Sequence, residues 1–317
     1  MNNSQYSIGV DIGGTNTVIG IVSSRGICLD TTSFKTAQFS AAEDFISQLA
    51  KSITELCDDK ELLGVGVGAP NANYYTGCIE DAPNLPWKGK IEFNKILAEK
   101  LNMRPEKIVL TNDANAATIG EKVFGKAKDK DNFIMITLGT GVGSGFFVNG
   151  QLLYGATGFA GEAGHLIVKE NGRQCNCGRK GCLETYCSAQ GIVRTAKEVL
   201  PQYPDSLLNN CKDIRSKDIF LAAEDGDEAA MQIFRITGDI LGLTLANLAA
   251  ITSPTNIYLF GGLALAGDYI LNPTQESMNR NMLNIFKHSV TIEISGLPDN
   301  SAAILGAAAL VSKKGQD

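Results

Sequence analysis

Apolar and turn-forming residues alternate in short runs at the start of the chain. The segment "YSIGVDIGGTNTVIGIVSSRGICLD" (Tyr6–Asp30) contains three apolar runs separated by Gly-containing turns, which predicts strand, turn, strand, turn, strand. The same pattern returns in "FIMITLGTGVGSGFFVNGQLLYG" (Phe133–Gly155), and aligning Gly13 with Gly139 superimposes the apolar positions of both runs. We therefore predict two domains of similar topology, each opening with a β-hairpin. Two unrelated Gly-turned hairpins would produce a similar pattern.

The remaining chain alternates between helical and strand patterns. Apolar residues recur at helical spacing in Ala41–Cys57, which predicts an amphipathic helix. Strands are also predicted in Leu62–Pro70 and Thr291–Ser295, and a strand followed by a helix is predicted in Lys107–Gly125 and in Asn256–Gly267. Further helices are predicted over Ser188–Leu200, Asp227–Ile251, Asn272–Phe286 and Ser301–Lys314. Alternating strands and helices indicate an α/β fold.

Composition and charge narrow the classes of function. The 317 residues are 44% hydrophobic, and single cores stop growing near ~250–300 residues, so two domains are expected. A net charge of −6 argues against non-specific nucleic-acid binding, which needs a basic surface. The first residues lack a basic segment followed by a long apolar run, and no run approaches ~20 apolar residues. We expect a cytoplasmic protein with neither a membrane nor a nucleic acid as partner.

Two glycine-rich turns are candidate phosphate sites. In "DIGGTN", Gly13 and Gly14 can take positive φ and expose backbone N–H groups, Thr15 adds a hydroxyl, and Asp11 could reach a phosphate-bound Mg²⁺ through water. "LGTGVGSG" (Leu138–Gly145) lacks the Lys-Ser/Thr of a P-loop, and a strand follows it where a dinucleotide fold would have a helix. Each turn alone could be an ordinary hairpin. Two at matched positions suggest one polyphosphate held from both sides.

Two further elements follow predicted strands. Gly261 and Gly262 offer bare backbone that a flat ring could approach, or they form a plain strand-to-helix turn. In "TNDANAA", Asp113 opens a predicted helix and could accept a proton from a substrate hydroxyl, while Asn112 could bind a polyol. Local reasoning by itself favours the simpler reading of Asp113 as a helix cap.

Four of the eight cysteines fall in "RQCNCGRKGCLETYCS" (Arg173–Ser188), and one of the two histidines lies just upstream. The spacing H-x9-C-x-C-x4-C, with Gly178 and Gly181 allowing the chain to fold back, predicts a tetrahedral Zn²⁺ site. The ligands would be His165, Cys175, Cys177 and Cys182. Four protein ligands leave no open position, so this zinc would be structural; Cys187 is not expected to bind it. Glu162 and Glu184 flank the metal loop and are candidates for binding sugar hydroxyls.

These motifs, in this order, resemble the ROK family of repressors and sugar kinases over essentially the whole chain. The similarity rests on "DIGGTN", "LTNDANAA", "LGTGVGSG", "EAGH" and "CNCGRKGCLE". It implies a two-domain actin-like, hexokinase-like ATPase fold, a duplicated ribonuclease H-like motif with a cleft between the domains and a small zinc-binding loop. We expect an N-terminal domain over 1–112, completed by the C-terminal helix 301–317. The larger domain would span 113–300 and carry the zinc loop 162–187.

The resemblance also implies an activity and a set of site residues. The family's enzymes phosphorylate hexoses or N-acylhexosamines with MgATP, so the expected cofactors are ATP, Mg²⁺ and structural Zn²⁺. Asp113 matches the catalytic base, and the sugar-binding positions match Asn84, Asn112, Glu162, His165 and Glu184. Phosphate positions match Gly13, Gly14, Thr15, Gly139, Thr140 and Gly141, and the adenosine side matches Gly261 and Gly262.

One loop departs from the family pattern. Many members carry Pro-Gly where this chain has Pro70-Asn71, which leaves the identity of the sugar open. Glucose is the first expectation; an N-acetylmannosamine or other N-acylhexosamine kinase is the alternative, and then a fructokinase. A sugar-responsive repressor is disfavoured because Asp11 leaves no room for a preceding helix-turn-helix domain. The resemblance also suggests a homodimer or tetramer.

Overall fold

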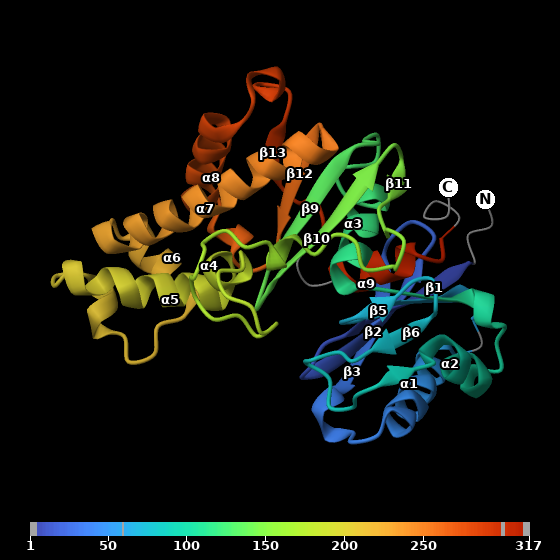
Figure 1. The fold of residues 1–317 in the computed structure, drawn as a ribbon. Coiled ribbons are helices and arrows are strands. Elements are labelled where there is room, and N and C mark those ends of the chain that lie inside the picture. Colours follow the sequence, from blue (N-terminus) through green and yellow to red (C-terminus); the bar gives the residue numbers. More distant parts are fainter. Residues whose placement is uncertain (1–4, 59, 299–301, 313–317) are drawn as a thin grey trace. The chain divides into compact units, whose positions relative to one another are not determined.

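The computed structural model describes residues 5–58, 60–298 and 302–312 (Figure 1). The chain packs as two compact units. Unit 1 comprises Met1–Asp131, Gly145–Gly161 and Gly296–Asp317, and unit 2 comprises Asn132–Ser144 and Glu162–Ser295. The domain limits expected from the sequence, 1–112 and 113–300, stay a prediction.

The sheet of unit 1 has five strands in the order β3-β2-β1-β4-β8. They are β1 (Tyr6–Ile12), β2 (Asn16–Ser23), β3 (Cys28–Lys35), β4 (Leu62–Gly68) and β8 (Ile108–Thr111). The first three strands form the predicted antiparallel meander, whereas β4 pairs parallel to both β1 and β8. Because β1, β4 and β8 are parallel, their carboxyl ends lie along one edge of the sheet.

A second sheet repeats this topology in the order β11-β10-β9-β12-β13. Its strands are β9 (Phe133–Leu138), β10 (Val142–Val148), β11 (Gln151–Leu152), β12 (Asn256–Phe260) and β13 (Thr291–Ile294). The boundary between the units falls within β10. Strand β12 pairs parallel to β9 and β13, as β4 does to β1 and β8. The matching strand orders confirm the duplicated α/β topology predicted from the two apolar patterns.

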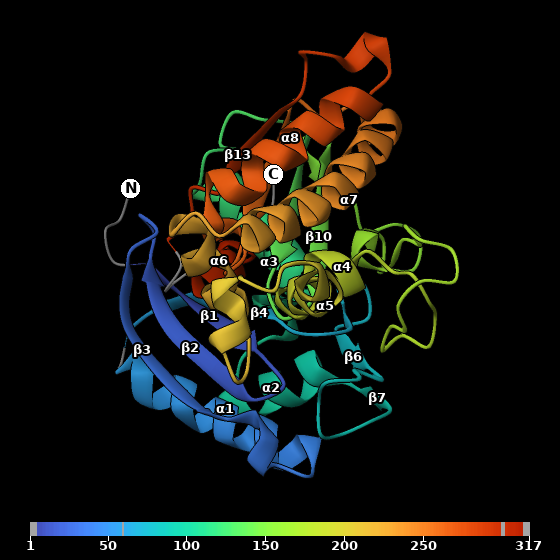
Figure 2. The same ribbon diagram turned by 90° about the vertical axis from the view of Figure 1, so that its left-hand side faces the viewer.

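Helices cover both faces of the first sheet. On one face, α1 (Ala42–Cys57) and α2 (Phe93–Leu101) bury their apolar residues against the strands, as the helical spacing of α1 predicts (Figure 2). On the other face, α9 (Ala302–Ala309) packs against the strands and against α3 (Asp113–Val123). A side chain at Gly9 or Gly66 would collide with the α9 backbone, so these glycines permit the close approach.

Unit 2 is largely helical outside its sheet. Its helices are α4 (Glu184–Cys187), α5 (Ala189–Val199), α6 (Ser216–Glu224), α7 (Glu228–Thr252) and α8 (Asp268–Asn281). Helices α7 and α8 lie side by side (Figure 1). By length and composition α7 alone among the described helices could cross a membrane, but 61% of its most apolar window is buried inside the protein. That burial is typical of a core helix.

Some predicted bounds are wrong. The helix expected over Asn272–Phe286 is α8, which begins at Asp268 and ends at Asn281, with Pro273 inside it. Helix α8 packs against α7 along this segment, a tertiary contact that the apolar spacing does not show. The last helix ends at Ala309, before the predicted Lys314; Ser301 and Lys314 lie outside the described residues.

Several short elements are absent from the predicted set. They are α2, α4, α6, and a small sheet of β5 (Ala72–Asn73), β6 (Cys78–Glu80) and β7 (Lys90–Ile91). Short 3₁₀ turns cover Thr36–Gln38, Pro105–Lys107, Ala163–His165, Leu200–Gln202, Leu207–Asn210, Ala264–Ala266 and Asn284–Phe286.

Candidate functional site

The carboxyl edge of the first sheet carries two carboxylates. Asp113 is the first residue of α3, directly after β8, and Asn112 is the helix cap, with its Oδ1 accepting from Ala114 N at 2.9 Å. Asp113 Oδ1 accepts from the same Ala114 N at 2.8 Å, so both side chains contribute to capping the helix start. Asp113 is exposed to solvent, yet desolvation by the surrounding protein raises the pKa of its carboxyl.

Asp11 lies near Asp113 at the same edge. Strand β1 pairs with β4 so that Asp11 is opposite Gly68, and Gly68 packs against the start of α3. Burial, and then the charge of Asp113, raise the pKa of Asp11 to about 6. A carboxylate whose ionisation is disfavoured by burial and by a neighbouring acid is a common feature of sites that bind cations or move protons.

The turn after β1 is tight but not left-handed. Gly13 N donates to Asn16 O at 3.0 Å. Neither Gly13 nor Gly14 has positive φ, so the reason given for these glycines in the sequence analysis is wrong. The structure gives a different reason: a side chain on Gly14 would collide with the backbone oxygen of Asn84. Thus the turn brings Asn84, Gly14 and the exposed Thr15 close together within unit 1.

In unit 2, the second glycine-rich turn contacts one of the predicted sugar-binding acids. Glu184 Oε2 accepts from Val142 N at 3.1 Å, and a side chain on Gly141 would strike the same carboxylate. Thr140 is exposed, and space is open beside Gly139. This contact could not be predicted from the sequence because the two residues are 42 positions apart.

Gly261 and Gly262 lie beside the same turn. Gly261 has a φ of +99°, which favours glycine, and its neighbour Leu263 donates through N to Leu138 O at 3.1 Å. Nothing lies within 4 Å of where a side chain on Gly262 would begin. Open space therefore lies beside Gly139, after β9, and beside Gly262, after β12.

The four predicted metal ligands converge. Their ligand atoms, from His165, Cys175, Cys177 and Cys182, all lie within 4.8 Å of one another. Cys177 Sγ and Cys182 Sγ are 3.6 Å apart, and Cys175 Sγ is 3.8 Å from His165 Nδ1. A tetrahedral zinc with Zn–S bonds of about 2.3 Å places its sulfur ligands about 3.8 Å apart, so the donor set fits.

The local backbone explains this convergence. Gly178 and Gly181 have φ of +89° and +79°, as their predicted role in turning the chain requires. Residues Ala163–His165 form a 3₁₀ turn in which His165 N donates to Glu162 O at 3.1 Å. This turn is tied to the start of β10, where Ala163 N donates to Ser144 Oγ at 3.1 Å. Cys187 is buried elsewhere, near Thr237 O, and is outside the cluster.

The departing loop keeps the backbone shape that glycine would give. Asn71 has a φ of +50°, in the left-handed region that asparagine tolerates better than most residues, and its Nδ2 donates to Glu80 O at 3.0 Å. The same loop carries Tyr74, whose ring stacks on Tyr154 with centroids 4.1 Å apart. Sequence analysis missed this aromatic pair because its members come from distant loops of unit 1.

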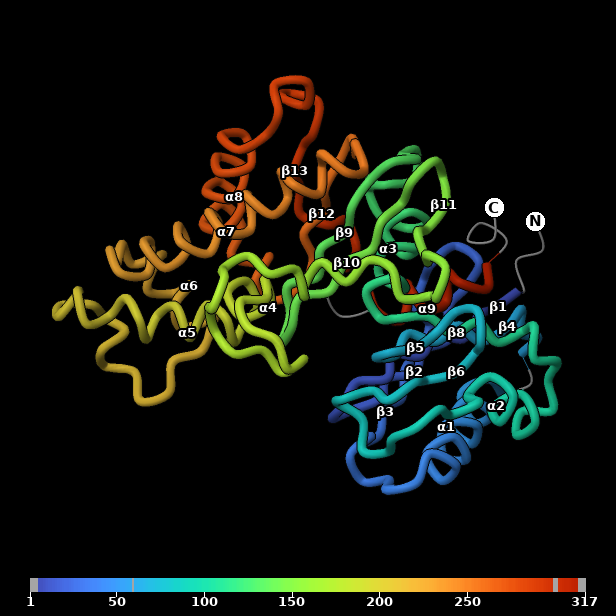
Figure 3. The backbone as a smooth tube through the Cα atoms, in the orientation of Figure 1, coloured from blue at the N-terminus to red at the C-terminus, as the bar shows by residue number. Residues whose placement is uncertain are grey.

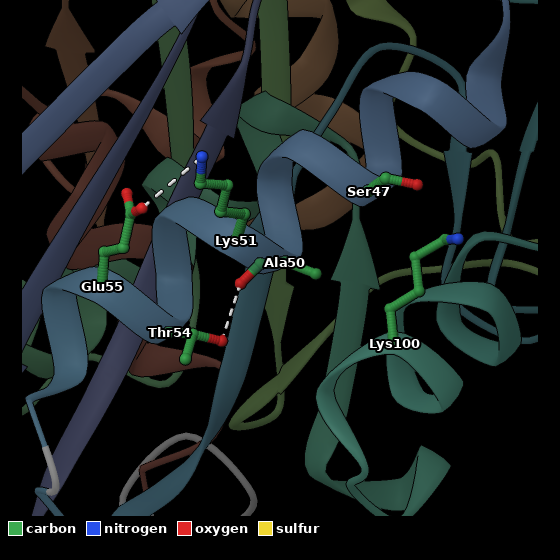
Figure 4. A pocket seen from close by; sticks show the side chains of 6 residues that line it. All are labelled: Ser47, Ala50, Lys51, Thr54, Glu55 and Lys100. Atoms are coloured by element: carbon green, nitrogen blue, oxygen red, sulfur yellow. Dashed lines mark hydrogen bonds and ion pairs between the residues drawn. The ribbon is translucent and has the colours of Figure 1, made fainter.

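A shallow hollow lies on the outer surface of α1 and α2, away from these groups in unit 1 (Figure 4). Its lining residues are Ser47, Ala50, Lys51, Thr54, Glu55 and Lys100. Lys51 pairs with Glu55 at 3.8 Å on the exposed helix face. None of the predicted site residues lines this hollow.

Comparison with known proteins identifies the family. Residues 7–314 match the sequence pattern of the ROK family. The chain belongs to the ROK family. A glucokinase of Thermotoga maritima is 34% identical to it over 312 residues, covering 97% of each protein. The ROK glucokinase of Streptomyces griseus, solved with glucose and AMPPNP, is 31% identical, with a TM-score of 0.81 over 96% of this chain and 98% of that one.

ROK proteins with another role are also similar. A xylose repressor of Bacillus subtilis is 27% identical over 304 residues, covering 94% of this chain and 75% of that protein. The family and the glucokinase structure confirm the predicted mixed α/β, hexokinase-like fold. Family membership alone leaves both a kinase and a repressor open, so the chemistry of the individual residues must decide between them.

Proposed function

We propose that this ROK protein is an ATP-dependent hexokinase-type phosphotransferase that transfers the γ-phosphate of MgATP to the 6-hydroxyl of glucose. The observation that carries the proposal is Asp113: a solvent-accessible carboxylate with a raised pKa at the carboxyl end of β8. A raised pKa increases the basicity of the carboxylate, which suits a group that must accept a proton from a hydroxyl. The glucokinases similar over nearly the whole chain support the assignment.

In unit 1, Asp113 is the proposed base and its neighbours orient the reactants. Asn112 uses Oδ1 as a helix cap, so its Nδ2 would donate to a sugar hydroxyl, with Asn84 as a second contact. The turn of Gly13, Gly14 and Thr15 would bind phosphate oxygens. Asp11 would hold a Mg²⁺-bound water, and the positive ion would lower the raised pKa of this carboxyl.

In unit 2, the proposed contacts divide between nucleotide and sugar. Gly139, Thr140 and Gly141 would contact phosphate, and Gly261 with Gly262 the adenosine. The carboxylates of Glu162 and Glu184 would accept hydrogen bonds from sugar hydroxyls, and His165 would accept or donate one. His165 directs Nδ1 toward Cys175, which leaves Nε2 for the sugar.

The reaction needs one proton acceptor and accurate positioning. As the 6-oxygen of the sugar bonds to the γ-phosphorus, the bond from that phosphorus to the β,γ-bridging oxygen breaks and ADP leaves. The hydroxyl proton passes to the Asp113 carboxylate. Mg²⁺, when bound, neutralises charge on the phosphate oxygens. The protein's own contribution is chiefly orientation of the two substrates.

The Cys₃His cluster is proposed to hold one structural Zn²⁺. Four protein donors complete a tetrahedral shell, so the ion would have no position for substrate or activated water. It would hold His165 and the flanking Glu184 in place. Metal analysis of the purified protein should give about one zinc per chain; a metal-free protein with full sugar affinity would refute this role.

A substrate panel tests the function directly. Purified protein with MgATP should phosphorylate glucose faster than N-acetylmannosamine, other N-acylhexosamines or fructose, measured as ADP release. Fast turnover of N-acetylmannosamine without turnover of glucose would replace glucose as the substrate while leaving the kinase class intact. Absence of turnover on every sugar, together with specific binding to an operator DNA, would instead favour a repressor.

Two further expectations remain proposals. A homodimer, or a tetramer, would be detected by light scattering of the purified protein. A cytoplasmic location would be tested by fractionation of the source cells.

A further inference from the structure

Arg173, just before the first cysteine of the metal loop, uses all of its side-chain donors. Its Nε and one terminal nitrogen form a fork on Glu198, at 2.9 and 2.7 Å. The same terminal nitrogen donates to Thr195 Oγ1 at 3.0 Å. The other donates to the carbonyls of Thr185 and Gly191, at 2.8 and 3.0 Å. An arginine has five N–H donors, so every one has a partner.

The backbone and ring contacts of Arg173 add to this arrangement. Its N–H donates to Tyr186 Oη at 3.0 Å, and its guanidinium lies over the Tyr186 ring, 4.4 Å from the centroid. Its carbonyl accepts from Gly181 N at 2.8 Å, which closes the metal loop on itself. The side chain is only 11% exposed. One residue therefore connects the metal loop to α4 and α5, which follow it in the chain (Figure 3).

The connection matters most for α4. This helix has four residues, Glu184–Cys187, and so short a helix cannot stabilise itself because nucleation is unfavourable. The Arg173 bond to Thr185 O fixes its backbone one residue after Glu184. At the tip of the Glu184 side chain, carboxylate Oε2 accepts a hydrogen bond from Val142 N at 3.1 Å. With backbone and carboxylate both restrained, Glu184 has little freedom to turn away.

We propose that Arg173 is a positioning residue that fixes Glu184 and the metal loop in the arrangement needed for sugar binding. The expected effect on sugar binding rests on the proposed function, whereas the expected effect on zinc release does not. Arginine is required because its planar guanidinium can bind both Glu198 oxygens while the two N–H groups of its remaining nitrogen reach the Thr185 and Gly191 carbonyls. A lysine has one charged nitrogen and cannot span these partners.

The test compares Arg173→Met with Arg194→Met as a matched control. Arg194 reaches the same loop from α5 but through one hydrogen bond, to Gln174 O at 3.1 Å. Loss of partners around a metal shell commonly costs about 10–100-fold in metal affinity or activity. Arg173→Met should therefore release zinc to a chelator about 10-fold faster or more, and Arg194→Met should match the parent.

The kinetic readout separates positioning from chemistry. For Arg173→Met, the KM for glucose should rise about 10-fold or more, while kcat and the KM for ATP change by less than about 3-fold. Arg173→Lys should restore little of the loss. Glu198→Gln, which weakens the fork without removing the arginine, should shift zinc release and KM in the same direction by a smaller factor.

Unchanged zinc release and unchanged KM in folded Arg173→Met would overturn the proposal. If Arg173→Met fails to fold, Glu198→Gln decides: parent-like zinc release and KM would overturn it equally. A protein that phosphorylates no sugar would refute the proposed function, yet the difference in zinc release between Arg173→Met and Arg194→Met would still test the positioning role.

Discussion

Replacing Asp113 by Asn should separate activity from stability. Asn112 is the N-cap residue of α3, and its Oδ1 and Asp113 Oδ1 both accept from Ala114 N, at 2.9 and 2.8 Å, so the Asn112 contact remains when Asp113 is replaced. The folded protein raises the pKa of Asp113, so it binds this proton more tightly than the unfolded chain does. Stability therefore falls as pH rises from the unfolded pKa through the folded one, and the ionised carboxylate lowers the free energy of unfolding at pH 7.

The two effects of Asp113→Asn have opposite signs. A neutral amide removes the desolvation penalty, and the lost charge at the helix N-terminus costs only about 0.3–1 kcal/mol. We expect the free energy of unfolding at pH 7 to be unchanged or higher. Removal of a general base should lower kcat by about 10²–10⁴-fold. That fold-change corresponds to roughly 3–5 kcal/mol in the activation barrier.

Three measurements check this prediction: kcat with glucose and MgATP, glucose affinity by calorimetry, and the thermal midpoint at pH 4 and pH 7. Asp44→Asn is the control, since Asp44 is an exposed acid in the first turn of α1. It should leave kcat unchanged. Glucose affinity of Asp113→Asn should stay within a few-fold of the parent. A kcat within 10-fold of the parent would refute the assignment of Asp113 as the base.

Three other changes test the surrounding structure. Gly164→Ala would place a methyl group against Val142 O. It should lower the free energy of unfolding by about 1–3 kcal/mol, measured by denaturant unfolding. An unchanged free energy would mean that the 3₁₀ turn can move. Asp11→Asn should raise the free energy of unfolding at pH 7 by up to about 3 kcal/mol, because the pKa of Asp11 is raised to about 6. This gain should vanish near pH 4. A gain that persists at pH 4 would show that the stabilisation has another cause. Cys182→Ser should abolish stoichiometric zinc, whereas Cys187→Ser, outside the cluster, should retain it; loss of zinc in both would indicate a general folding defect.

The duplicated sheets could be predicted because their information is local. Apolar runs and the turns between them recur at short range, so the meander of β1–β3 and the start of α1 follow from periodicity. The bounds predicted for α8 were wrong because its packing against α7, which apolar spacing does not record, accompanies a helix that begins at Asp268 and ends at Asn281. The strands of the small sheet are only two or three residues long, too short for a periodic signal.

In the candidate site, too, features that depend on local spacing could be predicted and contacts between distant residues could not. Spacing of cysteines and a histidine predicted a metal cluster because those ligands lie close together in the chain, and the structure brings their donor atoms within 4.8 Å. The contact of Glu184 with the turn at Val142, and the five partners of Arg173, could not be predicted. They depend on side chains whose partners are up to 42 residues distant.

The sequence by itself determined which chemical groups are present, where most of the longer strands and helices form, and that three thiols and an imidazole are spaced for a metal. Those properties depend on short-range periodicity and on residue type. Only the tertiary structure decided that Gly14 must be small to admit Asn84, that Glu184 contacts the turn at Val142, and that Arg173 is completely bonded. Such facts arise when segments far apart in the chain come within hydrogen-bonding distance, and no local pattern records that approach.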